Sequence, residues 1–314
     1  MADKIATREA YGNALAEIGA LNKDVVVLDA DLAEATKTIT FKKKFPDRFF
    51  DCGIAENNMM GVAAGLATTG KIPFASTFAM FAAGRSFDQV RNSIGYPHLN
   101  VKIGATHAGI TVGEDGATHQ CNEDIGLMRT IPGMVIINPS DAIEARCAVE
   151  AAVKYVGPVY MRFGRLAVSV INDKPEYKFE IGKGIRMAEG SDVTIVATGI
   201  MVEQALIARE MLLAEGISAA VINIHTIKPI DKEILISSAQ QTGAIVTTEE
   251  HNIIGGLGSA VCETLAGVCP VPVVRHGIED EFGKSGPAKE LLEHYKLNAA
   301  GICEKVKLAL SMKM

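Results

Sequence analysis

The sequence predicts an α/β protein built from two doubly wound domains, each with a largely parallel sheet flanked by helices. Short apolar runs rich in β-branched residues alternate with longer segments of helical periodicity. A chain of 314 residues is also too long for one typical core. The alternation weakens once, in a polar stretch punctuated by Lys, Pro and Gly. We therefore expect a first domain at 1–170, a linker at 171–190 and a second domain at 191–314.

Composition narrows the class of protein. The chain is 48% hydrophobic and 22% charged, which is typical of a soluble globular protein, and its net charge of -6 argues against binding to nucleic acid or to an anionic membrane. The charged N-terminus lacks the apolar core of a signal peptide, and no apolar run approaches the ~20 residues of a membrane span, so a cytoplasmic location is expected. The six cysteines include no CxxC pair, and no metal site is predicted.

The first elements of the chain form a helix followed by a strand. Residues 7–21 carry apolar side chains at helical spacing, with Thr7 as the expected N-cap. Residues 24–28 read as a buried strand, and Asp31 follows its carboxyl end, where sheets of this class place their sites. An aspartate that completes a turn is the alternative for Asp31. The lysines of the next connection, at 42–44, are expected on a solvated face.

A single carboxylate, Glu56, opens the next helix. An acid in a first turn is ordinarily explained by the helix macrodipole. The helix behind it is unusually rich in Ala and Gly, so close packing against another backbone would place Glu56 in a poorly hydrated junction. There the carboxyl would stay protonated and could donate a hydrogen bond to a heterocyclic nitrogen. Phe78 and Phe81 follow at a spacing that is usually a core pair, or else a surface for a flat ring.

The rest of the first domain continues the alternation up to a closing strand that ends near Arg162. A glycine-rich loop, GITVGEDGATHQ, separates His107 from His119 and lets the backbone wrap closely around a ligand. Two histidines near one loop are also compatible with a metal pair. An arginine at a strand end is more often a surface ion-pair partner than a ligand contact.

Five further strand and helix alternations make up the second domain. Its segment IIGGLGSAV contains Gly255, Gly256 and Gly258, which do not give the GxGxxG spacing of a dinucleotide site. We expect these glycines to serve close packing of a helix and a strand, or a subunit contact.

Several motifs together resemble one enzyme family. GIAENNMMGVAAGLA, TFAMFAAG and ATHAGITVGEDGATHQ resemble the pyrimidine-binding domain of transketolases, which belong to the thiamine diphosphate enzyme superfamily. TIKPID and EEHNIIGGLGSAV resemble the transketolase C-terminal domain. The resemblance implies a transferase of the pentose phosphate pathway that moves a two-carbon ketol unit from a ketose phosphate to an aldose phosphate.

The resemblance also implies how this chain would hold thiamine diphosphate. Glu56 would hydrogen-bond the aminopyrimidine ring and favour its imino tautomer, and Phe78 and Phe81 would receive that ring. Ile54 and Asp31 match cofactor or interface positions.

The sugar-binding residues follow from the same resemblance. His107, Asp115 and His119 would face the sugar, with the histidines in proton handling and Asp115 reading a hydroxyl. Arg8 and Arg162 would hold the sugar phosphate.

Three departures qualify this assignment. A further aromatic position is Gly84 here, and a serine that assists the phosphate aligns near Ala35. The chain also lacks the Gly-Asp-Gly of the diphosphate-binding domain, so magnesium is expected on another polypeptide. We therefore expect this chain to be the C-terminal subunit of a split enzyme, self-associated as a dimer and joined to an N-terminal subunit as a heterotetramer.

Three alternatives remain at this stage. A 1-deoxyxylulose-5-phosphate synthase has a similar loop, although the Val-Gly-Glu-Asp-Gly form favours transketolase. The beta subunit of a 2-oxo acid dehydrogenase is also split, but would not need the His and Arg set. A non-catalytic scaffold subunit is disfavoured because Glu56 and both phenylalanines are retained.

Overall fold

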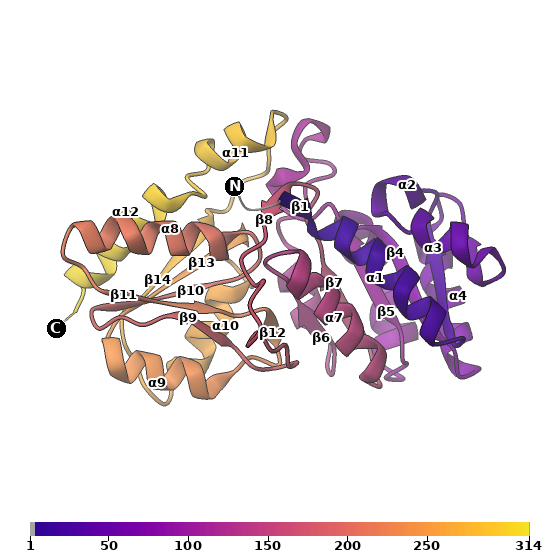
Figure 1. Ribbon diagram of the computed structural model, residues 1–314, viewed down its shortest axis with the longest axis horizontal. Coiled ribbons are helices and arrows are strands. Elements are labelled where there is room, and N and C mark those ends of the chain that lie inside the picture. The colour runs from indigo at the N-terminus through magenta and orange to yellow at the C-terminus, as the bar shows by residue number, and fades with distance from the viewer. Residues whose placement is uncertain (1–3, 314) are drawn as a thin grey trace.

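The first domain is built on a seven-stranded sheet that lies beside the smaller sheet of the second domain (Figure 1). The computed structural model describes residues 4–313. The strand order is β12-β6-β7-β5-β4-β2-β3, and every neighbouring pair is parallel except β12 with β6. The strands are β2 (Val25–Asp29), β3 (Phe49–Asp51), β4 (Ile72–Phe78), β5 (Lys102–Thr106), β6 (Val135–Ile137), β7 (Val159–Arg162) and β12 (Thr226–Lys228).

Helices cover both faces of this sheet because successive strand residues point to opposite sides. Val25 and Val27 share a core with α1 and α7, whereas Val26 and Leu28 share one with α4. The helices are α1 (Thr7–Leu21), α2 (Ala33–Thr36), α3 (Ile39–Lys44), α4 (Glu56–Thr68), α5 (Phe87–Gln89), α6 (Asp124–Arg129) and α7 (Ala142–Lys154), with 3₁₀ turns at Pro46–Arg48 and Ile110–Asp115 and π-helical turns at Met80–Arg85 and Val90–Gly95.

The second domain has a five-stranded sheet in the order β14-β13-β10-β11-β9, parallel except at β9. Its strands are β9 (Ile185–Ala188), β10 (Val193–Ala197), β11 (Ala219–Asn223), β13 (Ile245–Asn252) and β14 (Val273–Ile278), and its helices are α8 (Met201–Ala214), α9 (Lys232–Thr242), α10 (Leu257–Leu265), α11 (Ala288–His294) and α12 (Ala299–Ser311). A small pair, β1 (Lys4–Ala6) with β8 (Ala167–Ser169), completes the fold. The predicted fold class is confirmed.

Several local expectations need correction. Thr7 is the first residue of α1 and not its N-cap, because its hydroxyl accepts a hydrogen bond from Gly164 N at 2.8 Å. The strand expected at 24–28 is shifted by one residue and ends at Asp29. The domain boundaries stay a prediction, but the expected linker contains β9, and β12 crosses from the C-terminal half to the first sheet.

A buried ion pair of the first domain lies where that domain contacts the second. Arg162, at the end of β7, is 3% exposed, and its Nε lies 2.9 Å and 3.1 Å from the two carboxylate oxygens of Asp124. Its Nη2 donates to the carbonyl of Glu250 in the second domain at 2.9 Å. Tyr160 donates to the same Asp124 at 2.8 Å. The Arg162 guanidinium thus holds together the end of β7, the start of α6 and the second domain.

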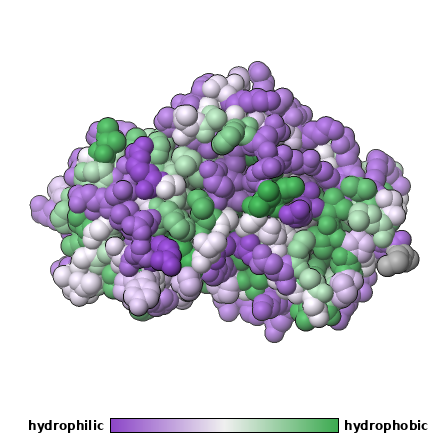
Figure 2. All heavy atoms as spheres, turned by 180° about the vertical axis from the view of Figure 1, so that it is seen from behind, coloured by the Kyte–Doolittle hydropathy of each residue, from purple (hydrophilic) through white to green (hydrophobic). Residues whose placement is uncertain are grey.

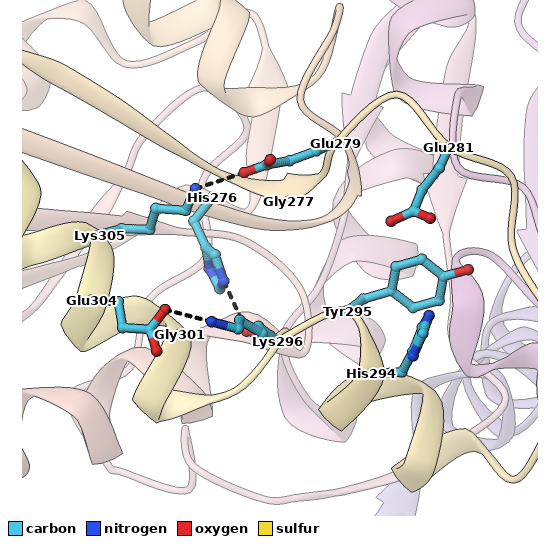
Figure 3. A pocket seen from close by; sticks show the side chains of 10 residues that line it. All are labelled: His276, Gly277, Glu279, Glu281, His294, Tyr295, Lys296, Gly301, Glu304 and Lys305. Carbon is cyan, nitrogen blue, oxygen red and sulfur yellow. Dashed lines mark hydrogen bonds and ion pairs between the residues drawn. The ribbon is translucent and has the colours of Figure 1, made fainter.

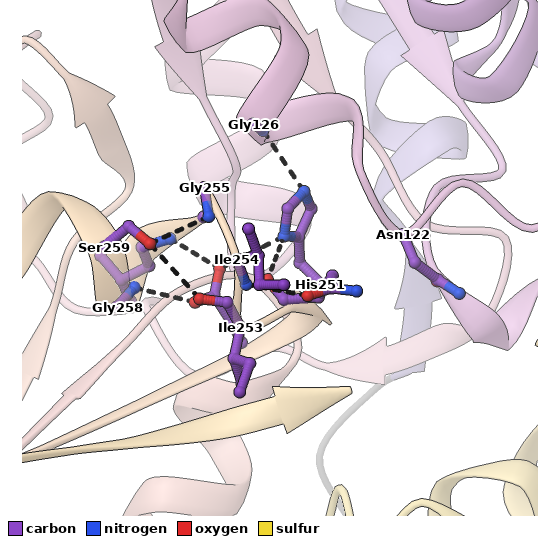
Figure 4. A network of polar contacts seen from close by, with 12 residues as sticks. Asn122, Gly126, His251, Ile253, Ile254, Gly255, Gly258 and Ser259 are labelled. Carbon is purple, nitrogen blue, oxygen red and sulfur yellow. Dashed lines mark hydrogen bonds and ion pairs between the residues drawn. The ribbon is translucent and has the colours of Figure 1, made fainter. Parts of the chain in front are cut away.

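Further contacts around His251 extend this junction (Figure 4). Burial lowers the pKa of His251 to about 4, so the neutral ring accepts from Gly126 N at 3.4 Å. Asn252 N donates to the carbonyl of Asn122 at 2.7 Å. Gly255, at φ 81°, packs directly on Gly126, and a side chain there would meet backbone. The glycine-rich segment therefore serves a contact between domains of one chain.

The outer surface mixes hydrophilic and hydrophobic residues, and the larger hydrophobic area in Figure 2 lies over the second domain. Over residues 4–313, no helix is both long and apolar enough to cross a membrane.

The first prediction concerns the buried ion pair between Arg162 and Asp124. Asp124→Ala leaves a buried guanidinium without its carboxylate, so the free energy of unfolding should fall by about 3–5 kcal/mol. Urea unfolding followed by circular dichroism measures this. The control is Asp24→Ala, which removes the exposed pair with Lys71 and should cost about 0–1 kcal/mol. Similar losses in both variants would contradict the proposed importance of the buried pair.

Candidate active site

Four aromatic rings form a wall at the carboxyl end of the first sheet. The Phe78 and Phe81 rings are nearly parallel, 15° apart, with centroids separated by 5.9 Å. His107 stacks on Phe78 at 3.8 Å, and His119 meets Phe81 edge-on at 5.5 Å. The structure therefore brings together four residues that the sequence singled out separately.

Strand ends and turns explain how these rings meet. Phe78 is the last residue of β4, and the π-helical turn that follows carries Phe81. His107 directly follows β5 and adopts a left-handed conformation with φ 56°. A left-handed backbone at a residue with a side chain is strained and is often found at functional sites. Because β4 and β5 are parallel neighbours, their ends deliver Phe78 and His107 to one edge.

Glu56 lies next to this wall and has a charged partner that the sequence did not indicate. It opens α4 and is 2% exposed, as expected. However, Nη1 of Arg85 donates to both of its carboxylate oxygens, at 2.7 Å and 2.8 Å. The Arg85 guanidinium also lies 4.3 Å from the centroid of the Phe81 ring. Glu56 is therefore paired with a guanidinium through two charge-assisted hydrogen bonds.

Sequence reasoning missed Arg85. The available signal was its position one residue after Gly84, at the end of the motif that supplies both phenylalanines.

His107 is held as a neutral ring. Burial lowers its pKa to about 3, and the positive charges of Arg8, Arg165 and Lys37 act in the same direction. Nη1 of Arg8 lies 3.0 Å from Nε2 of His107, and an arginine can only donate, so Nε2 accepts. The ring proton is then on Nδ1 and is donated to the hydroxyl of Thr106 at 3.0 Å. The proton-handling role expected of His107 stays a prediction.

The positively charged residues near His107, here called the cationic end of the site, are not the two arginines that the sequence predicted. Arg8 is placed beside His107 and also donates to the carbonyl of Ala35 at 2.9 Å. Arg162 is buried in its ion pair with Asp124, so the expectation that it holds a sugar phosphate is wrong. Arg165 comes three residues later, is partly exposed, and its charge lowers the pKa of both Arg8 and His107.

Three expected residues lie outside this cluster. Asp115 is exposed at the end of its 3₁₀ turn and forms no hydrogen bond or ion pair with the other described residues. Asp31 is exposed with φ 60°, and its N–H donates to Asp51 at 3.2 Å. Ile54 is 77% exposed in the loop before α4. Their roles remain predictions that need a partner or a ligand.

Two cavities differ in their relation to the wall. One of about 600 Å³ is lined by Met80, Thr118 and Gln120, the sequence neighbours of Phe81 and His119. Another, of about 330 Å³, belongs to the second domain (Figure 3). There the charged side chains mostly pair with each other, as in Lys305 with Glu279 at 2.6 Å. Across residues 4–313, no group of three or more His, Cys, Asp or Glu residues has the geometry of a metal site.

Comparison with known proteins identifies the family. The model of the transketolase pyrimidine-binding domain matches residues 3–170, and that of the transketolase C-terminal domain matches residues 182–302. The chain belongs to the transketolase family. It is 51% identical over 301 residues to a transketolase C-terminal section of Methanocaldococcus jannaschii, which covers 95% of this chain and 94% of that protein.

Further relatives show that this transketolase chain resembles a subunit. A solved structure described as a split-gene transketolase, an inactive beta4 tetramer, is 56% identical with a TM-score of 0.92, covering 99% of this chain and 100% of that one. Human transketolase is 36% identical over 97% of this chain but only 49% of its own length. The chain thus spans the length of split-enzyme subunits and about half of full-length transketolases.

The second prediction concerns the charge of His107. Because its pKa is lowered to about 3, its imidazole resonances should not shift between pH 8 and pH 5. Arg8→Met removes one nearby positive charge, so the pKa of His107 should move up toward its ordinary value. Proton NMR titration, with His107→Asn to assign the resonance, measures both. A midpoint near 6.5 in the unmodified chain would contradict the buried, neutral ring.

Proposed function

We propose that this chain is the C-terminal subunit of a thiamine diphosphate-dependent transketolase. It would transfer a two-carbon ketol unit from a ketose phosphate to an aldose phosphate together with a diphosphate-binding N-terminal subunit. The observation that supports this most directly is the joining of Glu56 to the wall of Phe78, Phe81, His107 and His119. The similarity over nearly all of this chain to a protein described as a split-gene transketolase supports the split arrangement.

The residues present suit the pyrimidine half of the cofactor. Phe81 is only partly buried and offers a flat apolar surface, and Glu56 supplies a carboxylate close to that ring through Arg85. An acid and an aromatic pair are the groups that an aminopyrimidine requires. We infer that the N-terminal subunit holds the diphosphate and magnesium, since the sequence of this chain contains no Gly-Asp-Gly.

When bound, thiamine diphosphate supplies a nucleophilic thiazolium carbon and an electron sink. The residues of this chain would orient the pyrimidine ring and the sugar, and would control the protons. Glu56 would hold the pyrimidine by a hydrogen bond, in exchange for its bond to Arg85. Neutral His107 would accept a hydrogen bond from the sugar at Nε2, in exchange for its bond to Arg8, and would add no positive charge. His119, partly exposed at the edge of the wall, remains available for a proton or a hydroxyl.

The charge around His107 supports an anionic sugar as substrate. Arg8 contacts His107 directly, and Arg165, which pairs with exposed Glu114 at 3.4 Å, supplies a second positive charge that lowers the pKa of the same ring. Guanidinium groups are well suited to bind a phosphate. Relatives are named for such sugars. A 6-deoxy-6-sulfo-D-fructose transketolase subunit of a Clostridium species is 46% identical, and an apulose-4-phosphate transketolase subunit of Phocaeicola vulgatus is 40% identical.

The alternatives can be separated by one set of assays. A 1-deoxyxylulose-5-phosphate synthase or a 2-oxo acid dehydrogenase would consume pyruvate, whereas a transketolase would transfer a ketol unit without it. A scaffold subunit would do neither in its own right.

The third prediction concerns the need for a partner. The purified chain should show no ketol transfer, because the residues that bind the diphosphate would belong to another polypeptide. A pull-down from the native source should recover an N-terminal transketolase subunit, and mixing the two with thiamine diphosphate and magnesium should restore transfer. Coupled spectrophotometry measures the rate. Full activity of the lone chain would overturn the split-enzyme proposal.

The fourth prediction concerns Glu56 in the reconstituted complex. Glu56→Gln keeps the shape but removes the proton-handling group, so kcat should fall by about 10²-fold or more. The matched control is Glu17→Gln on the exposed face of α1, which should leave kcat unchanged. Steady-state kinetics distinguishes a catalytic subunit from a scaffold subunit. Unchanged turnover in Glu56→Gln would support the scaffold alternative.

A further inference from the structure

The loop at Leu32–Thr38 forms one side of the cationic end of the site, yet most of its polar groups are already engaged. The carbonyl of Ala35 accepts from Arg8 at 2.9 Å. The hydroxyls of Thr36 and Thr38 donate to the buried carboxylate of Asp29 at 2.7 Å and 2.8 Å. The methyl side chain of Ala35 has nothing to donate. Lys37 is therefore the side chain on this part of the loop that can bind an anion.

The backbone at Lys37 has an unusual conformation that positions this residue. Lys37 ends α2 in the left-handed region, with φ 70° and ψ 8°. Lysine has no intrinsic preference for that region, so the surrounding structure must impose it. Gly12 of α1 makes the approach possible, because a Cβ there would lie 2.4 Å from the carbonyl oxygen of Lys37. The loop is therefore pressed against the helix that carries Arg8.

The ammonium group of Lys37 is only loosely paired. Its Nζ lies 3.9 Å from Glu9, at the limit of an ion pair, and both side chains are partly exposed. Such a pair contributes little and leaves the ammonium free to move toward a stronger anion. Its charge nevertheless reaches His107, where it acts in the same direction as Arg8 and Arg165.

We propose that Lys37 is a third cation of the sugar-phosphate end of the site and binds the terminal phosphate ester together with Arg8 and Arg165. This inference rests on the proposed transketolase function. Two guanidiniums and one ammonium around a phosphate supply positive charge on three sides. Lys37 thereby determines preference for phosphorylated over unphosphorylated sugars and takes no part in the ketol transfer itself.

A solvated lysine is the alternative, and the chain offers a matched example. Lys43 on α3 is exposed and forms no ion pair or hydrogen bond with the described residues. It lies six residues from Lys37, so Lys43→Met removes the same charge from the same region without touching the site.

The experiment uses the reconstituted complex, with hydroxypyruvate as a ketol donor that carries no phosphate. Ribose 5-phosphate and ribose serve as acceptors. Lys37→Met should raise KM for ribose 5-phosphate about tenfold, leave kcat unchanged, and leave kinetics with ribose unchanged. Lys37→Arg should keep KM for ribose 5-phosphate within about twofold, and Lys43→Met should behave as the unmodified complex.

A direct binding measurement separates this inference from the proposed function. Isothermal titration of the purified chain with ribose 5-phosphate should show affinity about tenfold weaker in Lys37→Met, even if no variant catalyses ketol transfer. Loss of transfer in every variant, the unmodified complex included, would overturn the proposed function alone. An unchanged affinity and KM in Lys37→Met, or an equal rise in KM for ribose, would overturn the role of Lys37.

Discussion

The arrangement of the candidate site depends on the buried ion pair between Arg162 and Asp124. It fixes the end of β7, from which the chain runs to Arg165, and the start of α6, which follows the loop that carries His119. The bond from Arg162 to the carbonyl of Glu250 ties both to the second domain. Desolvating two charges is costly unless further hydrogen bonds satisfy them, and here they do. The second domain thus holds the geometry of the first.

The aromatic wall separates two electrostatic environments. At one end Glu56 is neutralised by Arg85, which also covers the Phe81 ring. At the other end several cations surround His107, and burial keeps that ring neutral. A cofactor with a flat polar ring would bind at the end that carries Glu56. A substrate with an anionic group would bind at the end that carries the cations. The isolated chain keeps the charges of both ends partly paired, which accounts for stable burial of Glu56 without a ligand.

Sequence patterns predicted the fold class and much of the wall, and their failures have physical causes. The helix start at Glu56, the pair of phenylalanines and the position of Arg8 followed from local motifs. Periodicity could not tell that Arg162 turns into the core at the end of β7, and Arg165 was not considered. The partner of Glu56 was also missed, because Arg85 reaches it from another element. β12 has only three residues and pairs across about 90 positions, beyond any local signal.

The pairing of β12 with β6 has a consequence for biosynthesis. Until Thr226–Lys228 leaves the ribosome, the nascent first sheet exposes an unpaired margin at β6. Unpaired edge strands can pair with strands of other chains. A protein truncated after the first domain would keep this edge exposed and would therefore be prone to aggregate.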